Sequence, residues 1–399
     1  MSFASATFPG NWRWEESAGP AAMEALAPAW DDLVRAQGLP FISGALWMCC
    51  FWDAFGDGNQ VMRVLAGYED RRLVAIVPLR RTGRMLRVWS PVSNFHTPYV
   101  AFASERPPDR AAEAILKGFL ESSDVLDLGP VQPGAALCAG LMEAARSRHL
   151  PAMQTAAGGD AIIDLRGPWA DFRRSLSQNL ENATARHQRQ LQRLGELVFE
   201  EINGGDRLSP VLEECFRLEA EGWKADHGSP ILSRKDTLRF YTELAQRGAA
   251  AGALALYTLR LDGRLLAFEY CLRAGGRIDM LKISYAQDFA RYSPGNVLRY
   301  LVLKTEIERG KVTSYHMGIA SEWKLRWANR LDPLVRIRIY GRGVCPRLAY
   351  WGARLRAIVQ RCEPLRIAVR SARNLVGTIS RMGQRSSRVQ GTIRPRAPS

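Results

Sequence analysis

The sequence predicts a two-lobed α/β protein with mixed sheets, followed by a basic helical tail. Strand-like and helix-like stretches alternate through both halves of the 399-residue chain, which is typical of α/β folds. A small, polar, glycine-containing stretch at 151–160 (PAMQTAAGGD) is predicted as a linker between the halves. We therefore expect domains at 1–150 and 151–344, with the tail at 345–399.

The first half reads as helices and strands that can build one sheet with helices against it. Residues 23–37 read as an amphipathic helix, and 46–56 as a helix with aromatic anchors. Further helices are predicted at 105–122 and 135–150, and strands at 61–70, 72–83, 85–91 and 124–131.

The second half repeats this alternation. A helix is predicted over 170–195, where apolar residues recur at spacings of three and four before Gly195. A hairpin is predicted at Asp262-Gly263, a favoured turn pair. The other predicted helices are 208–228 and 236–248, and the predicted strands are 161–167, 196–202, 253–263, 264–276, 278–286 and 311–319.

Cysteine and histidine usage argues against a disulfide framework or a metal site. The seven cysteines are an odd number without a C-x-x-C pair, and the five histidines stand alone. We expect no metal. The chain has no run of about eighteen apolar residues and no secretory pattern at its start, so we expect a cytoplasmic protein without a membrane-spanning helix.

The net charge of +15 is concentrated in one segment. From Cys345 onward there are twelve Arg, one Glu, and neither Lys nor Asp, a charge of 12 − 1 = +11, which leaves 15 − 11 = +4 for the rest. The body of the protein is therefore nearly neutral, and its basicity belongs to the tail.

One short stretch, RYSPGNVL (291–298), is the most informative in the chain. Ser293-Pro294-Gly295 leads from a predicted strand into a predicted helix. One interpretation is an ordinary helix start, with Ser293 as N-cap and Pro294 at the first helical position. The other is a phosphate cradle, because a helix N-terminus offers unsatisfied N–H groups and a positive dipole end. The two are compatible.

Several segments resemble the GNAT acyltransferase superfamily. They are GRLLAFEY (263–270), LKISYAQDFARYSPGNVL (281–298), MGIASEWKLRW (317–327), LVAIVPL (73–79) and DVLDLGPV (124–131). The chain resembles in particular the CelD/BcsL-type acetyltransferase-like group, which is related in architecture to the FemAB transferases. The resemblance covers about residues 40–340 and implies two tandem GNAT-like lobes, the first degenerate.

The resemblance also implies a donor site for acyl-CoA, such as acetyl-CoA. In this superfamily a splayed strand pairs with the pantetheine arm, and the pyrophosphate lies at the start of the following helix. That places Lys282, Ile283 and Ser284 at the strand edge, and four residues at the phosphates: Arg291, Ser293, Gly295 and Asn296. The usual loop is [Q/R]-x-x-G-x-[G/A]; here Pro294 replaces its first glycine and removes one N–H donor.

Aminolysis of a thioester needs a base for the amine and donors for the oxyanion. We expect strand amides around residues 282–284 as donors. Glu269 is a candidate base because burial among apolar neighbours would raise its affinity for a proton. His316 is a second candidate base, Glu322 a third, and Tyr285 a candidate acid. Each of these also has the simpler interpretation of a packed or solvated residue.

Two clusters are candidates for binding the acceptor. Trp223 and Lys224 belong to EGWKAD (221–226), which reads equally as a helix end. Glu322 and Lys324 follow a predicted strand and also read as a solvated charge pair. The chain has only seven Lys against 48 Arg, and Lys224, Lys282 and Lys324 all fall in these segments.

The tail reads as a basic amphipathic helix, with an apolar stripe from Leu348 to Ile379 and arginines on its other faces. This pattern predicts binding of residues 345–380 to an anionic membrane surface. A helix packed on the body is the alternative. Arginine alone does not distinguish lipid phosphate from RNA phosphate, but we expect the membrane and not nucleic acid.

We therefore expect an acyl-CoA-dependent N-acyltransferase at the inner face of the cytoplasmic membrane. Its acceptor would be an amine of a polysaccharide, peptide or lipid precursor, bound between the lobes; the resemblance implies a role in cell-envelope or exopolysaccharide synthesis. One alternative is a FemAB-like aminoacyl-tRNA-dependent transferase. Another is a non-catalytic membrane-tethered binding module on the same fold.

Overall fold

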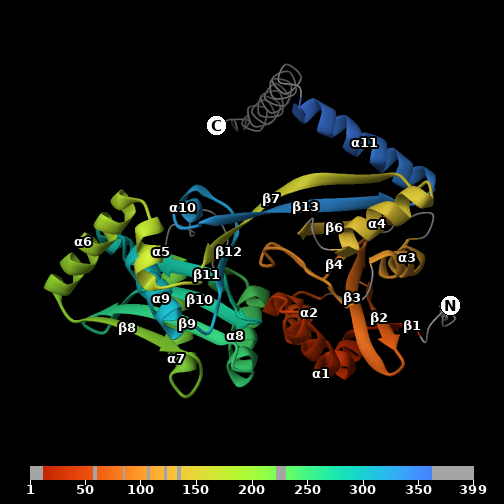
Figure 1. Ribbon diagram of the computed structural model, residues 1–399. Coiled ribbons are helices and arrows are strands. Elements are labelled where there is room, and N and C mark those ends of the chain that lie inside the picture. The colour runs from red at the N-terminus through yellow and green to blue at the C-terminus, as the bar shows by residue number, and fades with distance from the viewer. Residues whose placement is uncertain are drawn as a thin grey trace, which may run out of the picture.

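The computed structural model describes residues 12–56, 61–83, 86–105, 108–120, 124–132, 136–221 and 231–361. The thirteen strands found in these ranges form one mixed sheet that runs through the whole protein (Figure 1). Along its main path the order is β1-β2-β3-β4-β6-β13-β7-β12-β11-β10-β9-β8, and β5 pairs with β3.

The first half contributes six strands and four helices to this arrangement. The strands are β1 (Trp12–Ala18), β2 (Val61–Glu69), β3 (Arg72–Thr82), β4 (Arg87–Pro91), β5 (Ala103–Ser104) and β6 (Asp124–Val131). The helices are α1 (Pro20–Ala36), α2 (Ala45–Phe55), α3 (Pro108–Phe119) and α4 (Ala136–Ser147). The predicted helices and strands of this half are confirmed to within a few residues; β1 and β5 had not been predicted.

The second half contributes seven strands and most of the helices. The strands are β7 (Ala152–Asp164), β8 (Leu197–Ile202), β9 (Leu254–Leu261), β10 (Arg264–Ala274), β11 (Arg277–Tyr285), β12 (Ser314–Ile319) and β13 (Arg330–Tyr340). The helices are α5 (Trp169–Ser175), α6 (Gln178–Leu194), α7 (Leu208–Glu221), α8 (Lys235–Ala250), α9 (Pro294–Arg309), α10 (Glu322–Leu325) and α11 (Val344–Arg361).

Each half contains one parallel strand pair with a helix as its crossover. β4 and β6 are parallel and α3 connects them; β11 and β12 are parallel and α9 connects them. All the other paired strands in the described ranges are antiparallel, apart from one isolated bridge. The same strand–helix–strand unit therefore occurs twice, as a tandem arrangement of two similar lobes requires.

The predicted linker at 151–160 is wrong, because these residues belong to the long strand β7. β13 returns from the second half and pairs with β7 on one side and with β6 on the other. Alternating small and polar residues made this stretch look like a loop, but they suit a strand with one solvated face. The two halves share a sheet, and the division at 150–151 stays a prediction.

The predicted helix over 170–195 is two helices, because the chain is extended at Leu176 and Ser177. The Ser177 side chain accepts a hydrogen bond from the Leu180 amide and so caps α6. At the predicted hairpin between β9 and β10, Asp262 and Gly263 both have positive φ (49° and 80°), as a type I′ turn needs. That prediction is confirmed.

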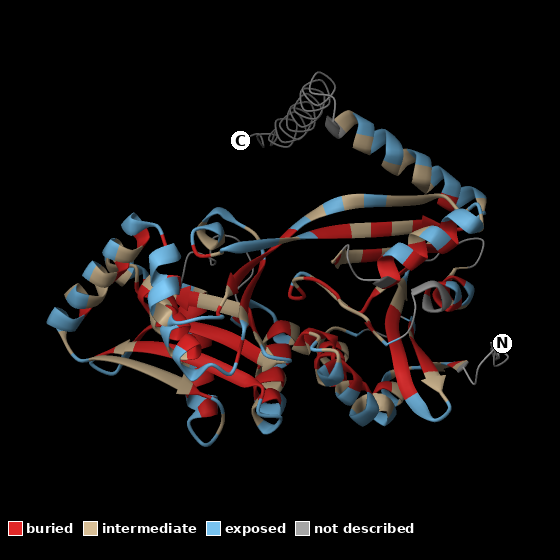
Figure 2. Ribbon diagram, viewed as in Figure 1, coloured by how far each residue is buried: buried red, intermediate tan, exposed pale blue. Residues whose placement is uncertain are grey.

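Helices cover both faces of the second-half sheet. On one face Arg299 of α9 reaches Glu269 of β10, while on the other Glu219 of α7 reaches Lys282 of β11. The two halves are also joined by packing of α2 against α8, where Trp47 and Phe51 meet Phe240 edge to face. Figure 2 shows the buried residues concentrated in the sheet on both sides of this contact.

Candidate active site

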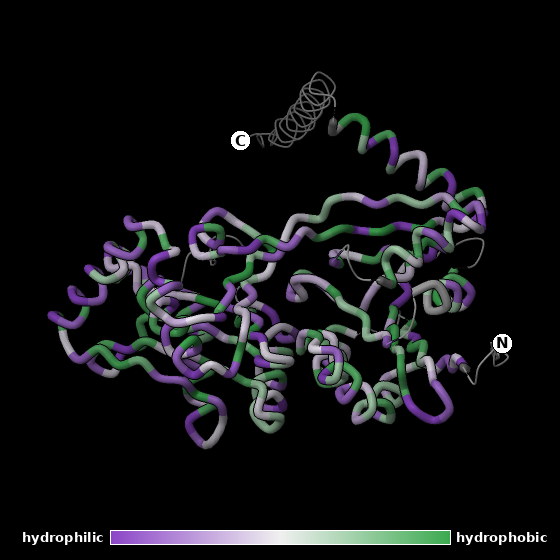
Figure 3. Tube along the Cα trace, in the orientation of Figure 1, coloured by the Kyte–Doolittle hydropathy of each residue, from purple (hydrophilic) through white to green (hydrophobic). Residues whose placement is uncertain are grey.

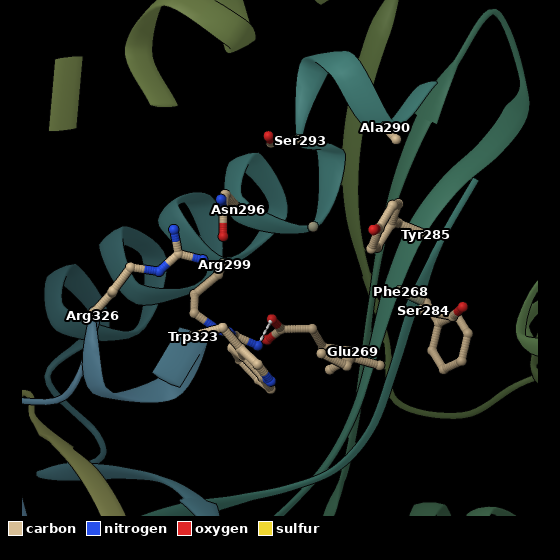
Figure 4. Close-up of a pocket in the computed structure, with 12 residues that line it drawn as sticks. Phe268, Glu269, Ser284, Tyr285, Ala290, Ser293, Asn296, Arg299, Trp323 and Arg326 are labelled. Atoms are coloured by element: carbon tan, nitrogen blue, oxygen red, sulfur yellow. Dashed lines mark hydrogen bonds and ion pairs between the residues drawn. The ribbon is translucent and has the colours of Figure 1, made fainter. Parts of the chain in front are cut away.

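A cavity of about 390 Å³ lies where β11 separates from β12 (Figure 4). The two strands pair only over Arg277–Asp279 and Ser314–His316, whereas β11 continues to Tyr285. The splayed pair that the resemblance implied is therefore present. The lining residues come from β10, β11, the start of α9 and the segment around α10: Phe268, Glu269, Ile283, Ser284, Tyr285, Ala290, Ser293, Gly295, Asn296, Arg299, Trp323 and Arg326.

The start of α9 forms one wall of this cavity. Ser293 is the N-cap residue in a left-handed conformation (φ 45°), its side chain makes no cap hydrogen bond, and Pro294 opens the helix. The amides of Asn296 and Val297 both donate to the Ser293 carbonyl, at 2.9 and 3.2 Å. Since Pro294 has no N–H, Gly295 supplies the one amide of this first turn without an acceptor among the described residues.

Gly295 is also the place where a ligand can come close to the backbone. A Cβ built there would first meet Tyr285 Cδ1 at 3.6 Å, an ordinary contact, so the space in front of it is small but open. The helix start therefore offers a phosphate one free backbone amide, and not the four that a helix N-terminus can supply.

Two polar side chains beside this amide suit an anion. Arg326 and Asn296 both line the cavity, and neither side chain has a hydrogen-bond or ion-pair partner among the described residues. Figure 4 shows Arg326 extending toward α9. A guanidinium and a free amide at a helix N-terminus together favour a phosphate or carboxylate group.

The floor of the cavity holds a buried ion pair. The Glu269 carboxylate lies 2.5 Å from the Arg299 guanidinium, and their residues are only 1% and 2% exposed. Tyr315 donates to the second carboxylate oxygen at 2.5 Å, and the Trp323 ring lies 4.8 Å from the guanidinium carbon. Burial raises the pKa of Tyr315 well above its usual value, so it stays a donor.

This ion pair changes the surroundings predicted for Glu269. Apolar neighbours alone were expected, whereas the Glu269 carboxylate lies directly against the Arg299 guanidinium. Burial works against the charge of Arg299, but the pairing with Glu269 outweighs it and raises the pKa of Arg299. The Arg299 Nε is also buried and has no partner within the described structure.

The structure brings seven predicted site residues together in the cavity. They are Glu269, Ile283, Ser284, Tyr285, Ser293, Gly295 and Asn296. Lys282 and Arg291 are not in its lining. The Lys282 ammonium lies 3.5 Å from Glu219 and 5.2 Å from the Tyr241 ring centre, on the opposite face of the sheet. The Arg291 guanidinium stacks over the neighbouring Tyr292 ring at 4.6 Å.

His316 also lies away from the cavity. Its Nδ1 is 2.7 Å from an Asp160 oxygen, and the side chain is 4% exposed. Lys324 donates to the Ile319 carbonyl at 2.8 Å, and Glu322 is exposed at the start of α10. Trp223 and Lys224 lie outside the described residues.

Sequence reasoning missed Arg299, Trp323 and Arg326. Arg299 falls within the helix predicted after Ser-Pro-Gly, but nothing distinguished it from the other arginines. Trp323 lies between the two predicted residues Glu322 and Lys324, so the segment was found and the wrong side chains were chosen. Over the described ranges, no three His, Cys, Asp or Glu residues are grouped in a way that could hold a metal ion.

Comparison with known proteins agrees with this geometry. Residues 178–325 match a family model described as an acetyltransferase (GNAT) domain. The chain is similar to the crystal structure of FemX, with 11% identity, 78% of this chain and 95% of that chain covered, and a TM-score of 0.54. A conserved protein of unknown function from Bacteroides thetaiotaomicron is similar at 12% identity, 80% and 97% coverage, and a TM-score of 0.50. No curated protein sequence matches the chain.

Residues 178–325, in the second half of this mixed α/β protein, are therefore similar to a GNAT acetyltransferase domain. The cavity lies mainly within the matched residues 178–325, and its one lining residue outside them, Arg326, follows directly.

Proposed function

We propose that this protein transfers an acyl group from acyl-CoA to an amine of a polysaccharide, peptide or lipid precursor in cell-envelope or exopolysaccharide synthesis. We also propose that the protein belongs to the CelD/BcsL-type group. It would act in the cytoplasm, at the inner face of the membrane. The donor cavity is the observation that carries the proposal. It joins the diverging edge of β11 to the free Gly295 amide and the Arg326 guanidinium.

In this proposal the diphosphate of the donor lies against Gly295, Asn296 and Arg326. The pantetheine arm follows Ile283 and Ser284 toward Tyr285. The Arg299 Nε donates to the carbonyl oxygen of the acyl group, because it is the buried donor that still needs an acceptor. Acetyl-CoA is the donor we expect here, bound without a metal ion.

The membrane partner is proposed from helix α11. Along its outward face, five apolar side chains are 51–74% exposed: Val344, Leu348, Trp351, Leu355 and Ile358. Their spacing of four and three residues places them in one stripe, and Figure 3 shows hydrophobic and hydrophilic residues alternating along α11. An exposed stripe of this size on a basic helix fits an anionic lipid surface. Residues 362–380 of the predicted anchor lie outside the described structure.

Dimerisation through this stripe is less favourable than binding of the stripe to lipid. Arg347, Arg354 and Arg356 flank it, and an identical partner would bring the same charges against them. No helix in the described ranges is long and apolar enough to cross a membrane.

Calorimetric binding of CoA and acetyl-CoA to the full chain tests the donor. We expect micromolar binding that is lost in Gly295→Trp, because the indole would fill the space in front of the amide. Gly295→Ala is the matched control, since its Cβ meets Tyr285 only at 3.6 Å. Binding that survives Gly295→Trp would place CoA elsewhere. If neither ligand binds the wild-type chain, acyl-CoA is excluded and aminoacyl-tRNA becomes the donor to test.

A further inference from the structure

A second group of polar residues lies on the face of the sheet opposite the donor cavity. Successive residues of a strand point to opposite faces. Tyr315 of β12 points toward the cavity side, where it donates to Glu269. Its neighbours Ser314 and His316 therefore point to the other face, which α7 and α8 cover further along the sheet.

Ser314, His316 and Asp160 form a hydrogen-bonded chain on that face. His316 Nδ1 lies 2.7 Å from Asp160 Oδ2, and His316 Nε2 lies 3.0 Å from Ser314 Oγ. Asp160 is fully buried, His316 is 4% exposed, and Ser314 is partly exposed. With Asp160 as a carboxylate, Nδ1 carries the proton, so the bare Nε2 accepts from the Ser314 hydroxyl.

The charged residues next to these three hydrogen-bonded residues are paired with other side chains and do not bond to the imidazole. Ser314 lies opposite Asp164 on β7, but Arg166 holds the Asp164 carboxylate through Nε at 2.8 and 3.0 Å. His316 lies opposite Asp279 on β11, and Arg277 holds that carboxylate at 2.6 Å.

Arg277 lies directly opposite Ser314 in the parallel β11–β12 pair. One of its terminal nitrogens donates to Tyr99 and Asp279. Its Nε is buried and has no partner within the described residues. A cationic donor beside a serine hydroxyl can bind the negative oxygen that forms when the hydroxyl attacks a carbonyl.

We propose that Ser314, His316 and Asp160 form a serine-nucleophile site that takes an acyl group from an ester or thioester. The geometry assigns Ser314 as nucleophile, His316 as general base, Asp160 as the group that orients His316, and Arg277 as the oxyanion donor. The same order of roles recurs on unrelated folds and is recognised by geometry, not by sequence position. This site goes beyond the acyl transfer proposed above and does not depend on it.

The chemistry balances with an acyl ester or thioester and water alone. Ser314 Oγ bonds to the acyl carbon and its proton moves to His316 Nε2. The bond from that carbon to the leaving oxygen or sulfur breaks, and His316 protonates the leaving group. Water, or an acceptor amine, then attacks the serine ester, gives its proton to His316, and Ser314 regains a proton as the acyl group departs.

A fluorophosphonate probe tests the site on the full chain without knowledge of either substrate. Such a probe reacts with a serine that an adjacent base has activated. We expect one adduct per chain, mapped to Ser314 by peptide mass spectrometry, and none in Ser314→Ala. In Asp160→Asn, which keeps the side-chain size, labelling should slow at least about 100-fold. Ser147→Ala is the matched control, because Ser147 is an exposed serine at the end of α4, outside both sites, and its loss should leave labelling unchanged.

The outcomes separate activation from mere packing. A hydrogen-bonded chain that only stabilises the sheet would leave Ser314 unreactive, so absence of an adduct on the folded wild-type chain overturns the proposal. Labelling of Ser314 at an unchanged rate in Asp160→Asn overturns it as well. Should Asp160→Asn fail to fold, as judged by circular dichroism, His316→Gln serves as the second variant, with the same expected slowing. CoA binding to the donor cavity is measured separately, so failure of either proposal leaves the other standing.

Discussion

The Arg299 guanidinium is held between the Glu269 carboxylate, 2.5 Å away, and the Trp323 ring, whose centre lies 4.8 Å from its central carbon. Both charged side chains are almost fully buried beneath the donor cavity. Two buried charges that neutralise each other are tolerated, whereas one alone is very costly.

Glu269→Gln should therefore destabilise the protein strongly. It leaves the Arg299 charge buried without a counter-charge, and breaking such a pair costs about 3–5 kcal/mol. The introduced amide oxygen still accepts from Tyr315, so the loss comes from the charge and not from that hydrogen bond. Chemical denaturation measures the free energy of unfolding.

The double variant Glu269→Gln with Arg299→Met is the control. Removing both charges should return the free energy of unfolding to within about 1 kcal/mol of the wild type. A double variant as unstable as Glu269→Gln alone would show that the pair is not the source of the stability.

Arg326 and Arg291 make a matched pair for the donor site. Both are exposed arginines near the start of α9, but only Arg326 lines the cavity, while Arg291 stacks on Tyr292. Arg326→Ala should weaken CoA binding about tenfold and reduce its dependence on salt, since a charge-assisted contact is lost. Arg291→Ala should bind CoA as the wild type does. Equal losses in calorimetry for the two variants would contradict the assignment.

The elements around the donor cavity were predictable because local pattern determines them. The Asp262-Gly263 turn, the alternation of β10 and β11, and the Ser293-Pro294 helix start are each encoded within a few neighbouring residues. The cavity residues that follow from strand edge and helix start, such as Ile283 and Gly295, were therefore found.

Contacts between distant segments were not predictable. β13 had not been predicted, because its pairing with β6 is made some 200 residues away along the chain, as the Arg338–Asp127 contact shows. Asp160 was placed in a linker, so its hydrogen bond to His316 could not be anticipated. Arg299 and Arg326 belong to the cavity only because of where the fold places them. Nothing in the sequence distinguishes them from the other arginines among the 48.

The apolar stripe on α11 predicts a defined effect on lipid binding. Leu348→Glu with Trp351→Glu places two negative charges at side chains that are 66% and 62% exposed. Flotation with phosphatidylglycerol-rich vesicles should fall at least about tenfold, because apolar area is lost and the basic surface is partly neutralised.

Leu331→Glu is the control for that experiment. Leu331 lies on β13 and is 52% exposed, so it tests the same chemistry away from α11. It should leave flotation unchanged. Equal binding of the α11 variant and the wild type, or no binding by the wild type to anionic vesicles, would exclude α11 as the membrane contact.

The buried His96 should make the free energy of unfolding depend on pH. Burial, and secondarily the nearby Lys282, lower the pKa of His96 from 6.5 to about 3 in the folded protein. The unfolded chain therefore binds a proton at this residue near pH 6.5, whereas the folded chain binds it only near pH 3. The stability that comes from the neutral imidazole is fully present above pH 6.5 and is lost as the pH falls toward 3. Asp236 and Arg234 are the other charged groups that influence it.

Between about pH 8 and pH 5 the wild type should lose about 2 kcal/mol more unfolding free energy than His96→Asn, because one proton is linked to unfolding over the part of that range below about pH 6.5. His96 Nδ1 lies 3.1 Å from the Tyr241 hydroxyl, so the variant will itself be less stable at pH 8. The slope with pH, and not the absolute stability, is therefore the measurement that decides. Parallel slopes for the two proteins would show that His96 is protonated in the folded protein as readily as in the unfolded chain.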